Sequence, residues 1–433
     1  MKNEELALKS LIGLWVGDCI GNMGQLYNIV DILKAFDEGI VKFGINNIDS
    51  RGTCFQYSDD TDEAIVLFSH LVKNGEVLQD KLAMEFAARF MYHQDGGEYM
   101  GYGLMTRKVL KNIYDGVPWR EANLTFKKSE GMSSTDNVIA GLAAGKTIKE
   151  SLEALKKLST IKPDDQQLVG SCGNGSVMRI PPLGAYMHDN SITDIIKQAT
   201  LSAEPTHSHP EGVAGAIAIA LLSNFIASMV ELMKINPNLI IDPEIHYKSL
   251  LSFVPKGEVW NGIEKASKLS IGTPLAKLIE ILGNGTHVTC QDTVPLCVFL
   301  TIKALTKYPI SEMYEKVITE VCQCSGDVDT NCAIVGGMIG IIGEVPTKWI
   351  KYCQPMEGLL DQPLPIVPTR QKKDPEYNKD ALKEALNNTT TDFSIEDQTS
   401  SLYETATVIF DSIKGKPPTF DEVLALRKSE LKL

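Results

Sequence analysis

The chain carries two short acidic clusters that lie far apart in the sequence, Ser58-Asp59-Asp60-Thr61 and Asp327-Val328-Asp329-Thr330. Each cluster leads into an apolar stretch with helical spacing, at 64–68 and 333–339. Carboxylates crowded at the buried end of a helix repel one another, and the helix N-terminus offsets only part of that charge. We therefore expect the two clusters to meet in the folded chain. There they would hold one or two hard divalent cations such as Mg²⁺, Mn²⁺ or Ca²⁺, which prefer oxygen ligands.

Each cluster taken alone has a simpler interpretation. A serine or aspartate before a helix is commonly an N-cap, and a carboxylate in the first turn interacts favourably with the helix dipole. The second cluster also resembles the start of an EF-hand loop, which needs Gly at its sixth position and Glu at its twelfth. Cys332 and Met338 stand at those positions, so an EF-hand is excluded. Capping and cation binding both stay open for each cluster.

The charge balance limits the partners that the chain can have. Its 433 residues carry a formal net charge of −13, while 43% are hydrophobic and 22% are charged, as in an ordinary soluble protein. So negative a chain is not expected to bind nucleic acid or an anionic membrane. A phosphate group held locally by backbone amides and a metal ion is still compatible with this charge.

Cysteine usage and the N-terminus predict a cytoplasmic protein. The nine cysteines are an odd number without disulfide-like spacing, which is typical of reduced thiols inside a cell. Residues 1–5 contain no apolar core of a signal peptide. The most apolar stretch, residues 212–230, contains Ser223 and Asn224 and predicts a buried helix rather than a membrane span. Zinc is not expected, because Cys322 and Cys324 have no matching second pair of ligands.

Apolar periodicity predicts helices along most of the chain, and no segment shows clear β-alternation. Helices are predicted at residues 5–16, 62–73, 79–93, 104–113, 137–158, 191–203, 211–230, 292–306 and 310–323, after the second acidic cluster, and at 379–388, 400–413 and 420–430. Between them we expect a tight turn at 17–21, a flap at 25–55, a proline-containing connector at 231–260 and a surface wrap or linker at 346–377. The glycines of the 17–21 segment permit close approach to a helix or to a ligand, and those at 336–340 to a helix.

Two glycine-rich segments are candidate phosphate-binding loops. Residues 101–103 read Gly-Tyr-Gly before a predicted helix, and residues 170–175 form a polar loop before an apolar segment. Backbone amides in such loops can bind a phosphate or a sugar, although a plain connecting loop is an equally simple interpretation. The first segment is not a dinucleotide-binding fingerprint, because Thr106 stands at the sixth position.

The motifs together resemble those of the ADP-ribosylglycohydrolase family, which includes the dinitrogenase reductase-activating glycohydrolase. The resemblance covers residues 5–345 and rests on six motifs in the family's order: Gly17-Asp18-Cys19-Ile20-Gly21, Ser58-Asp59-Asp60-Thr61, Gly101-Tyr102-Gly103, Gly170 through Arg179, Thr206-His207 and Gly326 through Thr330. Each motif is weak alone, and the ordered set is specific.

The resemblance implies an all-α fold, a compact orthogonal helical bundle with a central cleft that holds two Mg²⁺ ions, for which Mn²⁺ is a possible substitute. It implies metal ligands at Ser58, Asp59, Asp60, Asp327, Asp329 and Thr330. It implies a groove for ADP-ribose lined by Gly101, Gly103, Gly170, Ser171, Gly173, Asn174, Gly175 and His207, with Gln25 on the flap. Asp59, Asp60 and Asp327 are the catalytic candidates.

Two positions depart from the family pattern. Many relatives carry a flap glutamate that reaches the metal site, and the counterpart here is Gln25, or Asn28 in the arginine-specific register. Neither side chain can accept a proton, so an aspartate of the metal set would have to act as general base. Cys172 stands where some relatives place a tyrosine against the nucleotide. Ser58 replaces the commoner threonine, as it does in arginine-specific relatives.

Three functions are compatible with this pattern. The first is a Mg²⁺-dependent hydrolase that removes ADP-ribose from arginine or serine side chains of a modified protein, or cleaves related ADP-ribose glycosides. The second is a weak or inactive pseudoenzyme that binds ADP-ribose, and the third is a scaffold like the crystallin-type relatives. The six intact ligand positions favour the hydrolase, because such carboxylates are costly to bury without a metal. We expect a monomer with one family-like domain at 1–345 and a C-terminal extension at 346–433.

Overall fold

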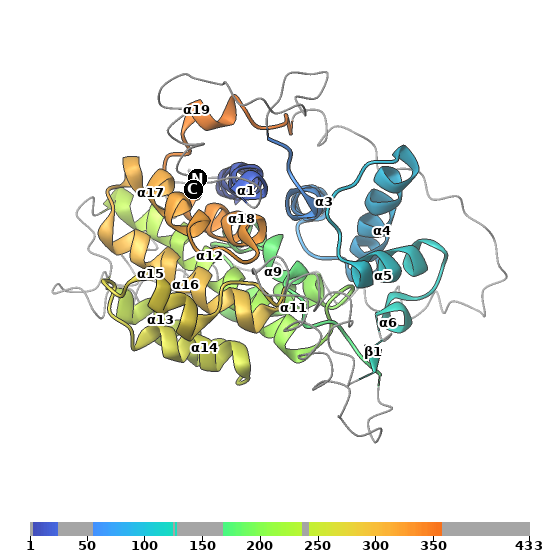
Figure 1. Cartoon of the computed structure of the whole chain (residues 1–433). Helices are drawn as coiled ribbons and strands as arrows, with labels where there is room; N and C mark the ends of the chain where they lie inside the picture. The colour runs from blue at the N-terminus through green and yellow to red at the C-terminus, as the bar shows by residue number, and fades with distance from the viewer. Residues whose placement is uncertain (1–2, 25–54, 124–125, 128–167, 236–241, 357–433) are drawn as a thin grey trace, which may run out of the picture.

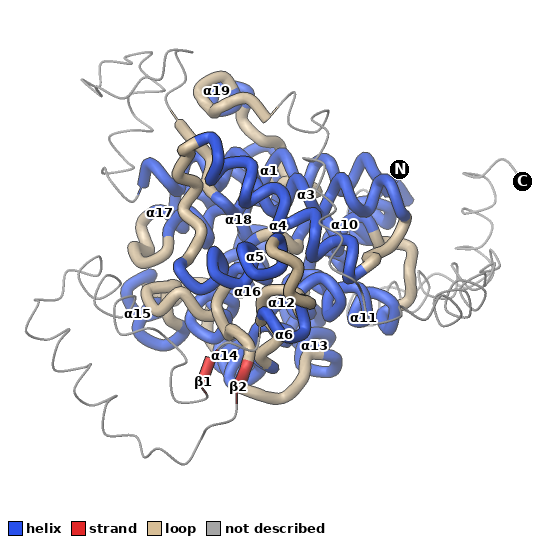
Figure 2. The backbone as a smooth tube through the Cα atoms, turned by 90° about the vertical axis from the view of Figure 1, so that its right-hand side faces the viewer, coloured by secondary structure: helices blue, strands red, loops and turns tan. Residues whose placement is uncertain are grey.

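The structure is a computed structural model of the chain, and it describes residues 3–24, 55–123, 126–127, 168–235 and 242–356. Within these ranges the regular structure is almost wholly helical, which confirms the predicted all-α class. The described strands are β1 (Phe126–Lys127) and β2 (Leu168–Val169), which pair antiparallel at the edge of the molecule (Figure 2). The predicted helices at 137–158 and beyond residue 378, and the flap up to residue 54, lie outside the described residues.

The described helices follow one another in the order α1 (Asn3–Gly24), α3 (Asp59–Asn74), α4 (Gln79–Gly96), α5 (Leu104–Tyr114), α6 (Trp119–Ala122), α9 (Gly175–Met178), α10 (Pro181–Tyr186), α11 (Ile192–Ala203), α12 (Pro210–Ile235), α13 (Pro243–Phe253), α14 (Glu258–Ser267), α15 (Leu275–Leu282), α16 (Cys290–Lys307), α17 (Ile310–Cys322), α18 (Val328–Ile339) and α19 (Thr347–Ile350). Every helix predicted within the described ranges is present. Most of their ends lie within a few residues of the predicted ones, and α1 extends further than predicted.

Helix α1 lies between the two helices that begin at the acidic clusters. Figure 1 looks along α1, with α18 and α3 beside it, α4 to α6 on one side of the molecule and α13 to α16 on the other. Helix α12 is apolar and long enough to cross a membrane, with a mean hydropathy of 2.1, but 89% of its apolar window is buried in the structure. It is therefore a core helix of this fold, as its sequence predicted.

The contact between α1 and α18 is a seam of glycines. A side-chain carbon on Gly13 would lie 2.3 Å from the carbonyl oxygen of Gly336 and 2.8 Å from the Cα of Gly340. Ser10 extends the seam, because its hydroxyl donates to the carbonyl oxygen of Gly337 at 2.7 Å. Only residues without a side chain allow two helix backbones to come this close. We call the contact formed by Gly13, Gly17 and Gly21 with α18 the glycine seam.

The predicted turn at 17–21 is wrong, since α1 continues through it to Gly24. A side-chain carbon on Gly17 would lie 2.2 Å from the carbonyl oxygen of Cys332, and one on Gly21 would lie 2.6 Å from the Cα of Asp329. Neither glycine has a positive φ. The four-residue spacing of these glycines places them on one face of a helix, so they serve close packing and not chain reversal.

The predicted connector at 231–260 is also wrong. Helix α12 continues to Ile235, and α13 and α14 occupy much of the rest of the segment. Proline misled the prediction, because Pro243 stands at the first position of α13, where its fixed φ suits a helix and its missing N–H is not needed. The side chain of Asp242 caps this helix by accepting from the amide of Glu244 at 2.9 Å.

Residues 346–356 wrap across α1 and α17. Trp349 of α19 is fully buried, with its ring 6.1 Å from that of Tyr314. The indole N–H of Trp15 donates to the carbonyl oxygen of Gln354 at 2.9 Å, and Cys353 pairs with Phe55 in an isolated bridge. The predicted division of the chain at residue 345 stays a prediction, because the chain after residue 356 is outside the described ranges.

The glycine seam predicts a strong effect of a single methyl group. We expect Gly17→Ala to lower the free energy of unfolding by about 2–3 kcal/mol, because the new carbon meets backbone that cannot move alone. Urea unfolding followed by circular dichroism measures this change. Gly96→Ala is the matched control, since its side-chain carbon would meet nothing closer than 3.9 Å. Equal unfolding midpoints for the two variants would contradict the role of the seam.

Candidate active site

The first acidic cluster forms the N-terminus of α3. Ser58 is the N-cap, and its hydroxyl oxygen accepts from the amide of Asp60 at 3.3 Å. The same hydroxyl lies 2.7 Å from Oδ2 of Asp60, to which it can donate its one proton. The simpler capping interpretation is thus correct for Ser58. It does not explain the two aspartates that follow, because neither carboxylate is needed to cap the helix.

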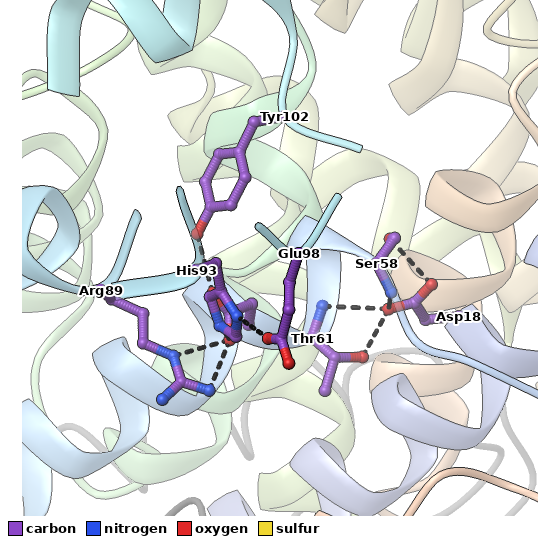
Figure 3. A network of polar contacts seen from close by, with 8 residues as sticks. Asp18, Ser58, Thr61, Arg89, His93, Glu98 and Tyr102 are labelled. Carbon is purple, nitrogen blue, oxygen red and sulfur yellow. Dashed lines mark hydrogen bonds and ion pairs between the residues drawn. The ribbon is translucent and has the colours of Figure 1, made fainter. Parts of the chain in front are cut away.

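Asp18 fastens α1 to the start of α3. Its carboxylate accepts from the amide of Ser58 at 2.9 Å and from the amide of Thr61 at 3.1 Å. The hydroxyl of Thr61 also donates to it at 2.6 Å (Figure 3). The hydroxyl of Ser58 lies 2.9 Å from its other oxygen, so Asp18 and Asp60 share the one proton of that hydroxyl. Burial is the main cause that raises the pKa of Asp18 to about 7, and the charge of Asp329 adds to it against the opposing effect of these hydrogen bonds.

The structure brings the two acidic clusters together through α1. Asp18 on one turn of α1 holds Ser58 of the first cluster, and Gly21 on the next turn touches the backbone of Asp329 in the second. The carboxylates of the two clusters are close enough to influence one another, since Asp329 raises the pKa of Asp59 and Asp327 raises that of Asp60. Residues 270 positions apart therefore share one buried acidic region.

Asp59, Asp60 and Asp327 resist ionisation in this region. Burial is the main cause that raises the pKa of each well above its ordinary value, and neighbouring carboxylates raise it further. Within the described part of the chain, no basic side chain lies within ion-pair distance of any of the three. Oδ1 of Asp60 is buried and has no hydrogen-bond donor among the described residues. A cation is the partner that these groups lack.

The next two acidic residues of α3 show the opposite arrangement. Glu63 pairs with Arg179 at 2.6 Å, and both side chains are fully buried. Arg179 also donates to the carbonyl oxygen of Ser202 and to the hydroxyl of Thr206, and it stacks over the ring of Phe86. The guanidinium of Arg179 thus neutralises Glu63, a carboxylate with a structural role.

Asp62 is neutralised by a network that Figure 3 shows at close range. Its carboxylate accepts from Nε of Arg89 at 2.7 Å, from Nε2 of His93 at 3.0 Å and from the hydroxyl of Tyr102 at 2.9 Å. The other ring nitrogen of His93 lies 2.6 Å from Glu98, so the ring bridges two carboxylates. Burial lowers the pKa of His93, but its bonds to Asp62 and Glu98 outweigh that effect and raise it.

The second acidic cluster begins α18. Asp327 occupies the N-cap position of this helix without making a side-chain cap, so capping does not explain it. Its Oδ2 instead accepts from the side-chain amide of Asn174 at 2.5 Å. That amide also lies 3.2 Å from the hydroxyl of Thr293 on α16. The loop at 170–175 is thereby fixed to the acidic region.

The predicted substrate-binding residues lie on two sides of this region. Gly101 and Gly103 are exposed, and a side-chain carbon on Gly101 would lie 2.9 Å from Oδ1 of Asp59. On the other side lie Gly170, Ser171, Gly173, Asn174 and Gly175, with Gly173 bridged to Thr289. Gln25 is outside the described residues.

His207 lies beneath the 170–175 loop and not on its surface. It is 3% exposed, and a side-chain carbon on Gly175 would lie 2.5 Å from its ring. Burial lowers the pKa of His207 to about 3, and the charge of Arg179 lowers it further. The ring is therefore neutral, and it supports the loop from below.

Sequence reasoning did not find the buried partners of α3. Arg179 ends one of the six family motifs, but the sequence pattern indicates no role for Asp62, Arg89 or His93. A signal was present, since Arg89 and His93 are four residues apart on α4 and share the face that packs on α3. A charged pair on the apolar side of a helix indicates a buried acidic partner.

The donor set suits a hard cation in its chemistry. Asp59, Asp60 and Asp327 offer carboxylate oxygens, and the buried Oδ1 of Asp60 has no hydrogen-bond partner in the described structure. Within the described ranges, however, no three His, Cys, Asp or Glu side chains already surround a single point as a metal site would require. Asp60 and Asp327 each direct one oxygen at a hydrogen-bond donor, so the acidic side chains would have to reorient to share an ion.

Acidic side chains grouped in one place are the groups with which a glycosidase cleaves its bond. The chain belongs to the ADP-ribosylglycohydrolase family, because a sequence model with the description "ADP-ribosylglycohydrolase" matches its residues 1–376.

The chain is also similar to named proteins over most of its described length. The ADP-ribosylhydrolase ARH3 of Gallus gallus is 24% identical over 79% of this chain and 88% of its own length. The ADP-ribosylhydrolase ARH3 of Homo sapiens is 22% identical over 80% of this chain and 88% of its own. A solved "ADP-ribosylglycohydrolase-related protein complex" is 14% identical over 82% of this chain and 93% of that chain, with a TM-score of 0.45.

The raised pKa of Asp18 predicts an inverted pH dependence for the cation-free protein. Between pH 4 and pH 7 the unfolded chain loses the Asp18 proton while the folded chain keeps it, because the pKa is about 7 only when folded. Over this range the unfolded state binds fewer protons than the folded state. The contribution of Asp18 to the free energy of unfolding therefore falls as pH rises, and it levels off above pH 7. We expect a loss on the order of 2–4 kcal/mol, measured by urea unfolding in EDTA. Asp18→Asn should show a smaller loss over the same range, and an equal loss in both proteins would contradict this assignment.

Proposed function

We propose that the protein is a Mg²⁺-dependent hydrolase that removes ADP-ribose from arginine or serine side chains of modified proteins, or cleaves related ADP-ribose O- or N-glycosides. One observation carries the proposal. Asp59, Asp60 and Asp327 converge in one acidic region without a described basic partner. The two acidic residues that follow in α3 each have one, because Arg89 of α4 neutralises Asp62 and Arg179 neutralises Glu63. The fold places arginines beside other buried carboxylates but not beside these three. This difference supports a role for the three in binding a ligand.

Two Mg²⁺ ions, with Mn²⁺ as a possible substitute, would be held by the oxygen donors of both clusters, namely Ser58, Asp59, Asp60, Asp327, Asp329 and Thr330. When bound, such ions orient a water molecule and sugar hydroxyls and stabilise charge that develops in the reaction.

The aspartates themselves would move the proton. A general base works best when its pKa lies near the operating pH, and burial raises the pKa of Asp59, Asp60 and Asp327. One of these three would accept the proton of the attacking water, in the place of the glutamate that Gln25 replaces. The remaining carboxylates would stabilise the positive charge of an oxocarbenium-like state on the ribose. Asn174 would keep Asp327 in a fixed orientation through their 2.5 Å hydrogen bond.

The two glycine loops would hold the rest of ADP-ribose. Gly101 and Gly103 are exposed, and a side chain on Gly101 would meet Asp59, while Gly170 and Gly175 let the second loop pack closely on Ser208 and His207. Their amides suit the negative charge of a diphosphate. His207 would act indirectly, by supporting the second loop from below. We further propose that the protein acts as a monomer in the cytoplasm, without nucleic-acid or membrane partners.

Hydrolysis is tested with ADP-ribosylated arginine and serine peptides and Mg²⁺. We expect release of ADP-ribose from at least one of them, and a fall of at least about 100-fold in Asp60→Asn, because a general base or ligand is lost. Asp115→Asn, an exposed aspartate on the far end of α5, should keep full activity. If neither peptide is cleaved while a control hydrolase is active, hydrolysis is wrong; micromolar ADP-ribose binding by calorimetry would then support the pseudoenzyme.

Cation binding is tested separately by thermal unfolding. We expect Mg²⁺ to raise the melting temperature relative to EDTA, because an ion that binds only the folded state stabilises it, by about 2.7 kcal/mol at one hundred times its Kd. Asp327→Asn should lose most of this increase, and NaCl at matched ionic strength controls for screening. Equal melting temperatures in Mg²⁺ and in EDTA would instead favour the scaffold function.

A further inference from the structure

The segment that joins α4 to α5 forms one rim of the candidate active site, and we call residues 98–103 the rim loop. Three of its members are fastened to the interior. The contacts are Glu98 with His93 at 2.6 Å, the Met100 carbonyl oxygen with the Asp59 amide at 2.6 Å, and the Tyr102 hydroxyl with Asp62 at 2.9 Å. Figure 3 shows the first and third of these bonds. A loop held at alternate residues cannot shift without disturbing α3.

Tyr99 lies between two of these fastened residues and points outward. Its side chain is 79% exposed, more than any other large hydrophobic side chain in the described part of the chain. The ring is nonetheless restrained, because the guanidinium of Arg107 lies 4.9 Å from its centroid. Arg107 is itself held, since its Nε donates to the carbonyl oxygen of Tyr102 at 2.7 Å.

An exposed aromatic ring held in one position is suited to binding. It gains little hydrophobic stabilisation from folding, because most of its surface stays in water. Its rotamer freedom is already restricted, so a ligand that packs on it loses less conformational entropy on binding. Tyrosine side chains of this kind often dominate the energy of protein interfaces.

The position of the ring indicates what would pack on it. Gly101 touches the carboxylate of Asp59, and two residues of chain span at most about 7 Å, so Tyr99 lies close to the proposed bond-cleaving centre. In an ADP-ribosylated protein, the polypeptide is attached at the bond that is cleaved. The adenine is separated from that bond by two riboses and a diphosphate. Gly101 faces Asp59 and is proposed to hold ADP-ribose, whereas Tyr99 is exposed on the outside of the loop. The group that crosses the rim past Tyr99 is therefore the polypeptide.

We propose that Tyr99, held by Arg107, is a docking residue for the polypeptide that carries the ADP-ribose. This inference rests on the proposed function and adds a substrate-recognition site outside the acidic region. Leu104, which directly follows the rim loop at the start of α5, is a second exposed apolar side chain, with 49% of its surface in water. The occupant is the peptide segment that flanks the modified residue.

The test compares two substrates that share one linkage, an ADP-ribosylated amino acid and the same residue within a short peptide. We expect Tyr99→Ala to lower kcat/KM for the peptide about tenfold, mainly through KM, with the amino-acid conjugate changed less than about twofold. Tyr99→Phe should behave as the wild type, because it keeps the ring. Phe253→Ala is the matched control, an exposed aromatic on α13 at the other side of the molecule in Figure 1, and it should change neither substrate.

Each result decides the matter. An equal loss on both substrates would mean that Tyr99 contacts ADP-ribose or shapes the site, and would overturn the proposal, as would no loss on either. If the wild type cleaves neither substrate, the hydrolase function fails on its own, and the docking proposal is read from calorimetric Kd values of the same two compounds. Weaker binding of the peptide alone in Tyr99→Ala would support docking, and an unchanged Kd would reject it.

Discussion

Negative charge at the start of α3 is the constraint on which the structure depends. Four carboxylates lie within five residues, 59–63, of which Asp60, Asp62 and Glu63 are buried and Asp59 is half-buried. Two of them are neutralised by basic side chains from elsewhere in the fold, Asp62 by Arg89 and Glu63 by Arg179. The other two face the second acidic cluster instead. The first turn of α3 thus carries two carboxylates with a structural role and two, Asp59 and Asp60, that are candidates for binding a cation. The pairs differ because arginines lie beside the structural pair alone.

The glycine seam gives this arrangement its geometry. Because α1 approaches α18 at backbone distance, Asp18 and Asp329 are brought to the same place, one on each side of the contact. Asp18 then positions the N-cap of α3 through four hydrogen bonds. Small residues in a packed interface therefore determine where the acidic side chains stand, without contributing any chemistry themselves.

The sequence predicted the parts of this site that repeat a chemical pattern, and it did not predict the parts that depend on packing. The acidic clusters and most helices follow from residue type and apolar spacing. Gly17 and Gly21 were ambiguous, because the same spacing serves a turn or a helix contact until the partner helix is known. The prolines of residues 231–260 favour a connector in the sequence, whereas Pro243 follows the capping residue Asp242 and begins a helix. The partners of Asp62 and Glu63 come from distant elements, and local patterns say little about such pairing.

The contact between α1 and α18 also limits when the acidic region can form during synthesis and folding. Ser10 of α1 and Gly337 of α18, which bond to each other, are separated by 327 positions. During synthesis the first acidic cluster and its anchor at Asp18 leave the ribosome long before α18 does, and closing so long a stretch is slow and entropically costly. Until then the glycine face of α1 is uncovered and the acidic region is only half assembled. A nascent chain that has not reached α18 therefore has no second cluster to offer a cation, and the site forms only when α18 docks.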